Sequence, residues 1–275
     1  MTYCVAMRLN AGLVFLSDSR TNAGMDQIST FRKMTVYEKP GERVLVMLSA
    51  GNLAITQAVK QLLNTEFIEG EEGEHVTIWT AKSMFDCARI VGSAVRKVYD
   101  RDAEALNKHG IDFNCSLILG GQIAGEPIRL FNIYAAGNFV EAGIEGVCYF
   151  QIGESKYGKP VIDRVVTPRT PLQEAAKCAL ISMDSTLKSN LSVGLPLDLM
   201  VYEADTLHVD KLINIDETNA YFRMIRSSWG QRLQQVFDSI ADPSWQGESP
   251  DLGGAPAATQ HQAMNPLSKI ASPQG

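Results

Sequence analysis

The chain has 275 residues and a net charge of −6, with 45% hydrophobic and 20% charged residues, which predicts a globular protein with a full core. Its Lys and Arg residues form no cluster, which argues against nucleic acid or an anionic membrane as a partner, because both need basic patches. No stretch reaches the length of a membrane span and no leader precedes the first strand, so we expect a cytoplasmic location.

The five cysteines predict no metal site and no disulfide framework. They are odd in number, widely spaced and mostly within apolar stretches, and no C-x-x-C pair occurs. The four histidines are equally dispersed. We therefore expect reduced, buried thiols, no cofactor and no bound metal.

The first half of the chain predicts two hairpins followed by two helices. Strand-forming residues separated by turn signals place the strands at 2–9, 12–18, 31–38 and 43–50. The last of these runs is almost wholly apolar, so both of its faces should be covered. Helical spacing of apolar residues follows at 52–68, with Asn52 as N-cap, and at 77–109.

The second half repeats this order. Strands are expected at 113–122, 128–135, 148–153, 195–204 and 211–216. One helix is expected at 171–189, with Thr170 as N-cap and Pro171 as the first helical residue, and another at 217–238. This order indicates an α/β protein with two sheets face to face and helices on both outsides, a four-layer α/β/β/α sandwich.

The composition changes near residue 240. Residues 241–275 are rich in Pro, Gly, Ser, Gln and Ala and carry few large apolar side chains. Such a segment buries too little surface to offset its ordering entropy. We expect a single domain at 1–240 and a tail at 241–275 that is flexible or docks on a neighbouring subunit.

The first residues could carry a nucleophile. Removal of Met1, usual before a small residue, would leave Thr2 with a hydroxyl and a free α-amine, whose ordinary pKa of about 7.7–8.0 suits a base at neutral pH. A tight hairpin would return Asp18 beside Thr2. Lys33 is the nearest cation besides Arg20 and Arg32, and its charge would lower the pKa of the amine. Each residue also has an explanation without catalysis. Thr2 could be an ordinary second residue, Asp18 a turn former, and Lys33 a solvated strand residue.

The spaced motifs resemble a known family. Thr2 is followed by S-D-S-R, F-R-K, S-A-G-N and S-L-I-L-G-G-Q, at residues 17–20, 31–33, 49–52 and 116–122. This series is similar to the β-type subunits of proteasome-like proteases, and most closely to the bacterial Anbu branch, through to about residue 240. The resemblance implies a sandwich of the N-terminal-nucleophile hydrolase type.

The resemblance also implies an activity and a set of site residues. The activity is that of a self-assembling threonine peptidase that works through an acyl-enzyme. Thr2 would be the nucleophile, supported by Asp18 and Lys33, and the backbone N–H of Gly51 would bind the oxyanion. The cleft would pair with an extended peptide along Arg20, Thr21 and Asn22.

The chain departs from the family pattern around the nucleophile. Ser155 could replace the serine of the family's Gly-Ser-Gly motif, but Glu154 occupies its expected place. Asp184 lies too early for the family's aspartate. Asn190 and Ser192 fit the end of the helix without matching the residue types. The spacing from Thr2 to the lysine is also one residue shorter than usual.

Two other functions stay open at this stage. The same nucleophile could act on a small amide or an isopeptide, or the chain could be a catalytically silent scaffold of a ring. The resemblance implies a homo-oligomer, as a ring or an open helical ring, that takes a peptide or an unfolded protein. The chain has no G-x-x-x-x-G-K-[ST] motif, so any ATPase would be a separate partner.

Overall fold

The computed structural model describes residues 1–22, 28–70, 73–143 and 146–243. The chain divides into two compact units, Met1–Gly230 and Gln231–Gly275. Most of the expected tail lies outside the described residues, and the predicted domain boundary near 240 stays a prediction.

The first sheet has the strand order β12-β1-β2-β13-β14, and every neighbouring pair is antiparallel. The turn Asn10-Ala11 joins β1 to β2 and pairs Leu9 with Gly12, as the turn residues predict. The strands are β12 (Tyr149–Gly153), β1 (Tyr3–Leu9), β2 (Gly12–Asp18), β13 (Leu197–Glu203) and β14 (Lys211–Ile215).

The second sheet has the order β11-β10-β9-β6-β5 and is also antiparallel throughout. Its strands are β11 (Phe139–Glu141), β10 (Arg129–Ile133), β9 (Cys115–Ile123), β6 (Arg43–Gly51) and β5 (Met34–Lys39). Two short hairpins accompany it, β3 (Arg20–Asn22) with β4 (Ile28–Thr30) and β7 (Ile68–Glu69) with β8 (His75–Val76).

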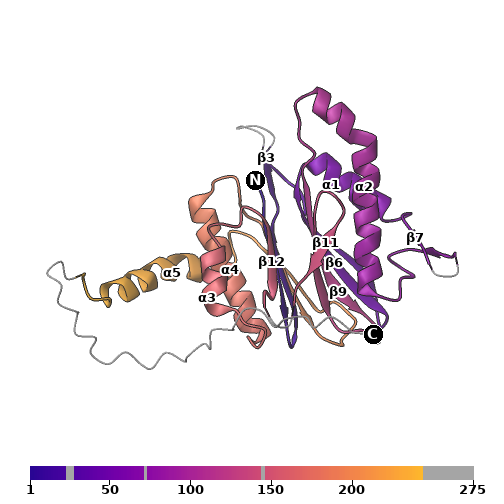
Figure 1. Cartoon of the computed structure of the whole chain (residues 1–275). Helices are drawn as coiled ribbons and strands as arrows, with labels where there is room; N and C mark the ends of the chain where they lie inside the picture. Colours follow the sequence, from indigo (N-terminus) through magenta and orange to yellow (C-terminus); the bar gives the residue numbers. More distant parts are fainter. Residues whose placement is uncertain (23–27, 71–72, 144–145, 244–275) are drawn as a thin grey trace, which may run out of the picture. The chain divides into compact units, whose positions relative to one another are not determined.

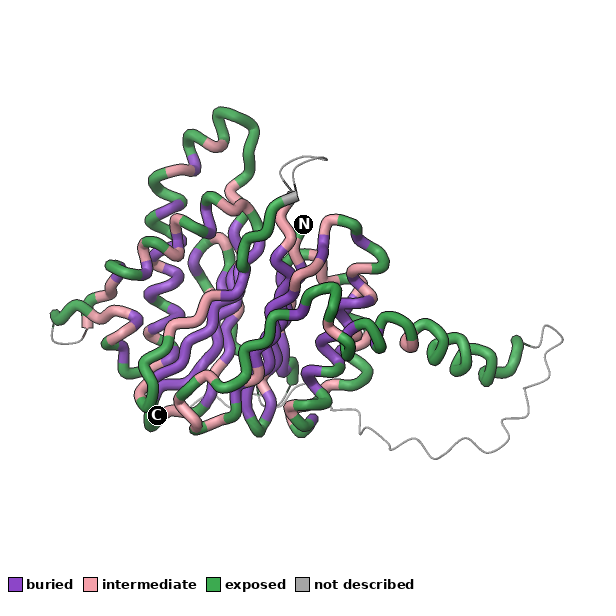
Figure 2. The backbone as a smooth tube through the Cα atoms, turned by 180° about the vertical axis from the view of Figure 1, so that it is seen from behind, coloured by how far each residue is buried: buried purple, intermediate pink, exposed green. Residues whose placement is uncertain are grey.

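The two sheets pack against each other, and helices lie on their outer faces (Figure 1). Alternate residues of β1 and β2, such as Cys4, Ala6 and Phe15, meet Val44 and Val46 of β6 in one buried cluster. The helices α1 (Leu53–Leu62) and α2 (Met84–Lys108) cover the outer face of the second sheet. The strands are accordingly the most continuously buried part of the chain (Figure 2). The α/β class is thus confirmed, as is the expectation that both faces of β6 are covered.

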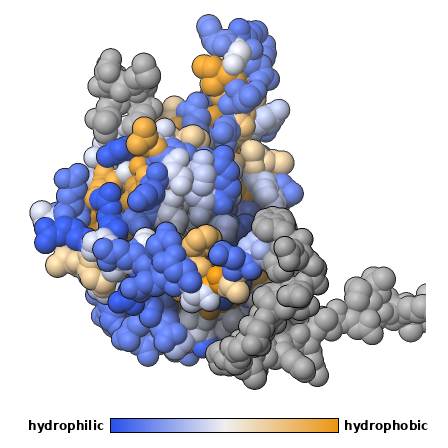
Figure 3. All heavy atoms as spheres, turned by 90° about the vertical axis from the view of Figure 1, so that its left-hand side faces the viewer, coloured by the Kyte–Doolittle hydropathy of each residue, from blue (hydrophilic) through white to orange (hydrophobic). Residues whose placement is uncertain are grey.

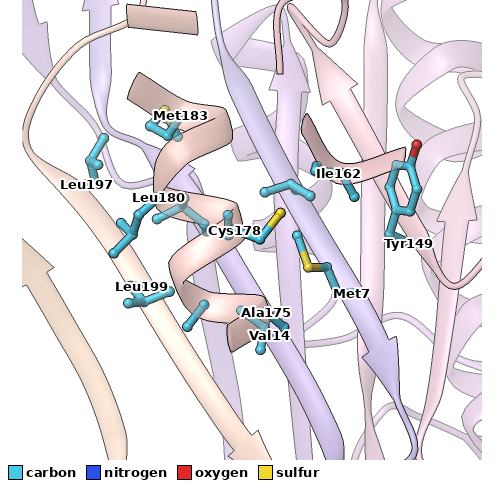
Figure 4. Packing of buried hydrophobic residues seen from close by; sticks show 14 of the residues in the cluster. Met7, Val14, Tyr149, Ile162, Ala175, Cys178, Leu180, Met183, Leu197 and Leu199 are labelled. Atoms are coloured by element: carbon cyan, nitrogen blue, oxygen red, sulfur yellow. The ribbon is translucent and has the colours of Figure 1, made fainter. Parts of the chain in front are cut away.

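The outer face of the first sheet packs against α4 (Leu172–Ser189) and α3 (Lys159–Val165). The residues of β1 and β2 that point away from the second sheet, Met7 and Val14 among them, meet Ala175, Cys178 and Met183 (Figure 4). The last helix, α5 (Ala220–Asp238), adds Phe222 to this cluster from its first turns. The period of two along the strands thus divides their side chains between two apolar layers.

Helix starts differ from the sequence-based expectation at three places. The helix expected at 77–109 begins at Met84, because the hydroxyl of Ser83 accepts a hydrogen bond from the amide of Asp86 (3.0 Å) and caps it. The helix expected at 171–189 begins at Leu172. Thr170 is not its N-cap, since its hydroxyl accepts from the amide of Thr167 (2.9 Å) instead. The helix expected at 217–238 begins at Ala220.

The helix expected at 52–68 begins as predicted but ends earlier than predicted. Asn52 caps it, accepting from the amide of Ala54 (3.0 Å), but the helix ends at Leu62. The following residues, Ile68–Glu69, turn into the short strand β7, which pairs with β8. Six elements were not expected from the sequence. They are short, and their apolar residues are too few to set a period: β3, β4, β7, β8, β11 and α3.

All five cysteines are free and buried, which confirms the expectation from their spacing. Burial raises the pKa of the Cys87 and Cys115 thiols to about 12. No helix among the described residues is long and apolar enough to cross a membrane. The face on the left-hand side of Figure 1 is mainly hydrophilic, with hydrophobic side chains in small patches (Figure 3).

Candidate active site

The hairpin β1–β2 places Thr2 beside the end of β2. Cys4 pairs with Ser17, so the first residues of β1 lie opposite the last residues of β2. The amide of Tyr3 donates a hydrogen bond of 3.0 Å to Oδ1 of Asp18. The return of Asp18 to the start of the chain is therefore confirmed, and the contact is made through the residue that follows Thr2.

Asp18 and Lys33 form a buried ion pair. The ammonium of Lys33 donates to Oδ1 (2.8 Å) and Oδ2 (2.7 Å) of Asp18, and also to the carbonyl of Arg20 (2.7 Å). The two side chains are 8% and 0% exposed. Burial raises the pKa of Asp18, while Lys33 and the amide of Tyr3 act in the opposite direction.

The sequence predicted that Lys33 lies in a strand, and this prediction is wrong. Residues 31–33 link β4 to β5, and β5 begins only at Met34. The carbonyl of Lys33 accepts from both the amide (3.0 Å) and the hydroxyl (3.2 Å) of Ser49 in β6. Because this link is tied to β6, the lysine side chain turns inward to Asp18.

The α-amine of the chain is held at the same place. Burial lowers the pKa of the Met1 amine below its ordinary value of 8.0, and the charge of Lys33 lowers it further, while Asp18 and Glu154 oppose this shift. A lowered pKa leaves more of the amine neutral at pH 7 and able to accept a proton.

Gly51 ends β6 next to this group in a conformation that favours glycine. Its φ is +112°, and a Cβ at this position would lie 2.3 Å from the carbonyl oxygen of Asn114. That same oxygen accepts from the amide of Asn52 (2.8 Å). The backbone at 51–52 is therefore fixed against the residue that precedes β9.

Thr2, Lys33 and Gly51 line one pocket of about 350 Å³. Its walls come from the chain start, the strand β3, the 31–33 link and the junction of β6 with α1. The lining residues are Met1, Thr2, Arg20, Thr21, Arg32, Lys33, Ser49, Ala50, Gly51, Asn52, Leu53 and Thr56. Asn22 belongs to β3 and pairs with Ile28.

A second polar group contacts Thr2 from the opposite side. The amide of Glu154 donates to the carbonyl of Thr2 (2.7 Å), and its carboxylate accepts from the side-chain amide of Asn190 (3.0 Å). The oxygen of that amide in turn accepts from the backbone N–H of Ser192 (2.9 Å). Glu154 and Asn190 thus form a hydrogen-bonded pair, at two positions where the sequence departs from the family pattern.

Ser155 and Asp184 contact other groups. The amide of Ser155 donates to the carbonyl of Gly153 (3.1 Å), and its hydroxyl makes no hydrogen bond among the described residues. Asp184 is buried and lies 3.6 Å from the guanidinium of Arg226 in α5. The supporting role expected for Ser155 stays a prediction.

A hydrogen-bond network around Tyr3, the residue after Thr2, was not predicted from the sequence. The Tyr3 hydroxyl lies 2.6 Å from the hydroxyl of Ser182 in α4 and accepts from the side-chain amide of Gln151 in β12 (2.5 Å). Nothing in the local sequence marks these partners, which are more than a hundred residues away. No group of three or more His, Cys, Asp or Glu in the described part of the chain is placed to hold a metal.

Solved structures resemble this chain closely. Anbu (ancestral beta-subunit) from Yersinia bercovieri is 53% identical, with a TM-score of 0.80, and the match covers 88% of this chain and 99% of that one. Anbu from Hyphomicrobium sp. strain MC1 is 48% identical, with a TM-score of 0.78 and coverage of 88% and 99%.

A third structure, described as the helical assembly of the Anbu complex from Pseudomonas aeruginosa, is 45% identical, with a TM-score of 0.80 and coverage of 90% and 100%. No protein-family model and no curated protein matches the chain.

Proposed function

Because the chain belongs to the bacterial Anbu branch of the proteasome-type β-subunit family, we propose that it is a threonine peptidase with Thr2 as nucleophile. The observation that carries this proposal is the buried Asp18–Lys33 pair, which is bonded to the amide next to Thr2. In this proposal the α/β fold is the four-layer sandwich of the N-terminal-nucleophile hydrolases.

The proposed reaction begins with the loss of Met1. The neutral α-amine of Thr2, directly or through a water, takes the proton of the Thr2 hydroxyl as Oγ attacks a peptide carbonyl. The amine then passes the proton to the leaving nitrogen, and an ester on Oγ remains. Water hydrolyses this ester with the same amine as base, which restores Thr2.

The neighbouring groups support each step of this scheme. The charge of Lys33 disfavours a second cation and so keeps the amine neutral, while Asp18 holds Lys33 in place. The backbone N–H of Gly51 would stabilise the oxyanion, a type of contact worth about 10²–10³ in rate. The position of Gly51 in the pocket of Thr2 favours this role.

The substrate would bind as an extended chain. One edge of β3 pairs with β4, where Thr21 is opposite Ser29, and Arg20 and Thr21 line the pocket. A peptide lying along Arg20, Thr21 and Asn22 would therefore add a strand beside Thr2. This geometry fits a peptide or a segment of an unfolded protein.

We further propose that the chain assembles with copies of itself, as a ring or an open helical ring. The support is the relative from Pseudomonas aeruginosa, which is described as a helical assembly. A separate ATPase and a cytoplasmic location stay predictions.

Intact-mass measurement tests the proposal. The purified protein should lack Met1 and should gain one adduct from a peptide epoxyketone or a β-lactone. Thr2→Ala should lose the adduct, and Thr2→Ser, which keeps the hydroxyl and the amine, should retain it. Retention of Met1 would contradict the mechanism.

Other results of this experiment would favour a different nucleophile, a different substrate or a scaffold function. Equal adducts on Thr2→Ala would implicate Cys4, although that thiol is fully buried and burial raises its pKa; Cys4→Ala would then lose them. An adduct on Thr2 without cleavage of any peptide would favour a small amide or an isopeptide as substrate. Loss of Met1 without any adduct would favour a scaffold subunit.

A further inference from the structure

The ionisable side chains that line the pocket all carry positive charge. They are Arg20, Arg32 and Lys33, and no carboxylate is among the lining residues. The whole chain has a net charge of −6, so a cationic pocket does not follow from its composition. The charge of this pocket is a local property.

The three cations differ in how far they are neutralised. Lys33 contacts both carboxylate oxygens of Asp18, so little of its charge is left for a substrate. The guanidinium of Arg20 donates to the carbonyl of Leu191 (3.3 Å), and its buried Nε has no hydrogen-bond partner. Neither contact supplies a negative charge to Arg20.

Arg32 is the most available of the three. It is exposed, and its guanidinium forms no ion pair or hydrogen bond with another described residue. Its carbonyl accepts from the ammonium of Lys60 (3.4 Å), which adds a further cation close by. The two carboxylates near the chain start have other partners, since Asp18 binds Lys33 and Glu154 binds Asn190.

We propose that this pocket selects a carboxylate-bearing side chain on the acyl side of the bond to be cleaved, with Arg32 as the specificity-determining residue. The proposal rests on the proposed function, because it needs a peptide bound at Thr2. A guanidinium binds a carboxylate through two parallel hydrogen bonds, and a pocket of about 350 Å³ has room for a side chain of this size. A Lys or Arg side chain would be repelled.

Two peptide epoxyketones that differ only in Glu or Gln next to the reactive group provide the test. The wild type should form the Thr2 adduct about tenfold faster with the Glu compound, equivalent to about 1.4 kcal/mol. Raising the salt to about 1 M should shrink the advantage, because screening then acts over about 3 Å. A third compound with Lys at this place should react most slowly.

Arg32→Gln should lose the preference for Glu, so that its rates with the Glu and Gln compounds become equal. Arg169→Gln is the matched control, since Arg169 is also exposed and the net charge changes equally, but it lies between α3 and α4. This variant should keep the full preference.

Equal rates for the Glu and Gln compounds on the wild type would overturn the specificity proposal and leave the threonine mechanism intact. A full preference in Arg32→Gln would overturn the role of Arg32. Absence of a Thr2 adduct with every compound would overturn the proposed function and this proposal together.

Discussion

Replacing Gly51 by Ala tests whether the backbone at this position is as restricted as the structure indicates. The φ of +112° is costly for a residue with a side chain, by about 1–3 kcal/mol. The added Cβ would also lie 2.3 Å from the carbonyl oxygen of Asn114, a separation that real Cβ atoms essentially never show. Overpacking of this kind typically adds about 1–3 kcal/mol.

These two costs predict a loss of about 2–6 kcal/mol in the free energy of unfolding. For a chain of this size each kcal/mol lowers Tm by about 2–4 °C. Differential scanning calorimetry should therefore show a decrease in Tm of about 4–24 °C. The N–H of Gly51 must move with the strand, and formation of the Thr2 adduct should slow by about 10²–10³.

Gly41→Ala is the control for backbone strain alone. Its φ is +76°, and nothing lies within 4 Å of the added Cβ. It should cost only about 1–2 kcal/mol and should leave the adduct rate unchanged. If Gly51→Ala lowers Tm no more than Gly41→Ala and reacts at the wild-type rate, both the predicted clash with Asn114 and the oxyanion role are wrong.

Two more predictions concern charge. The rate of Thr2 adduct formation should rise with pH and level off, because the Thr2 amine acts as a base only when it is neutral. The nearby charge of Lys33 disfavours the cationic amine, so the midpoint should lie below the ordinary amine pKa of about 7.7–8.0. The amide of Glu154 bonds to the carbonyl of Thr2 and its carboxylate favours the cationic amine, so Glu154→Gln should shift the midpoint further down; an unchanged midpoint would exclude that interaction. Lys33→Met should cost about 3–5 kcal/mol near pH 8 by leaving the Asp18 charge unpaired. The decrease in Tm of Lys33→Met should become smaller toward pH 5, because the raised pKa of Asp18 lets this carboxylate bind a proton there. The double variant Lys33→Met/Asp18→Asn should recover part of the lost Tm. A decrease in Tm that does not depend on pH would contradict this reasoning.

Local pattern was sufficient where neighbouring residues determine the structure. The strand Gly12–Asp18 has its predicted bounds, because a compact turn and an apolar run specify it together. The cap at Asn52 depends on a side chain two residues from its donor. The approach of Asp18 to the chain start follows from the same hairpin.

Long-range contacts determine the features of the site that could not be predicted from the sequence. The inward turn of Lys33 depends on the bonds between its carbonyl and Ser49 in β6. The pairing of Glu154 with Asn190 joins residues on two separate elements. No period or turn signal encodes such distances.

The sequence by itself determined the α/β class, the hairpin that brings Asp18 to Thr2, and the family, because these follow from local periodicity and spaced motifs. Only the tertiary structure decided which polar groups surround Thr2 and that the pocket beside it is lined by cations without a carboxylate. Those properties depend on the packing of strands and helices that are far apart in the chain, and on which charges that packing buries together.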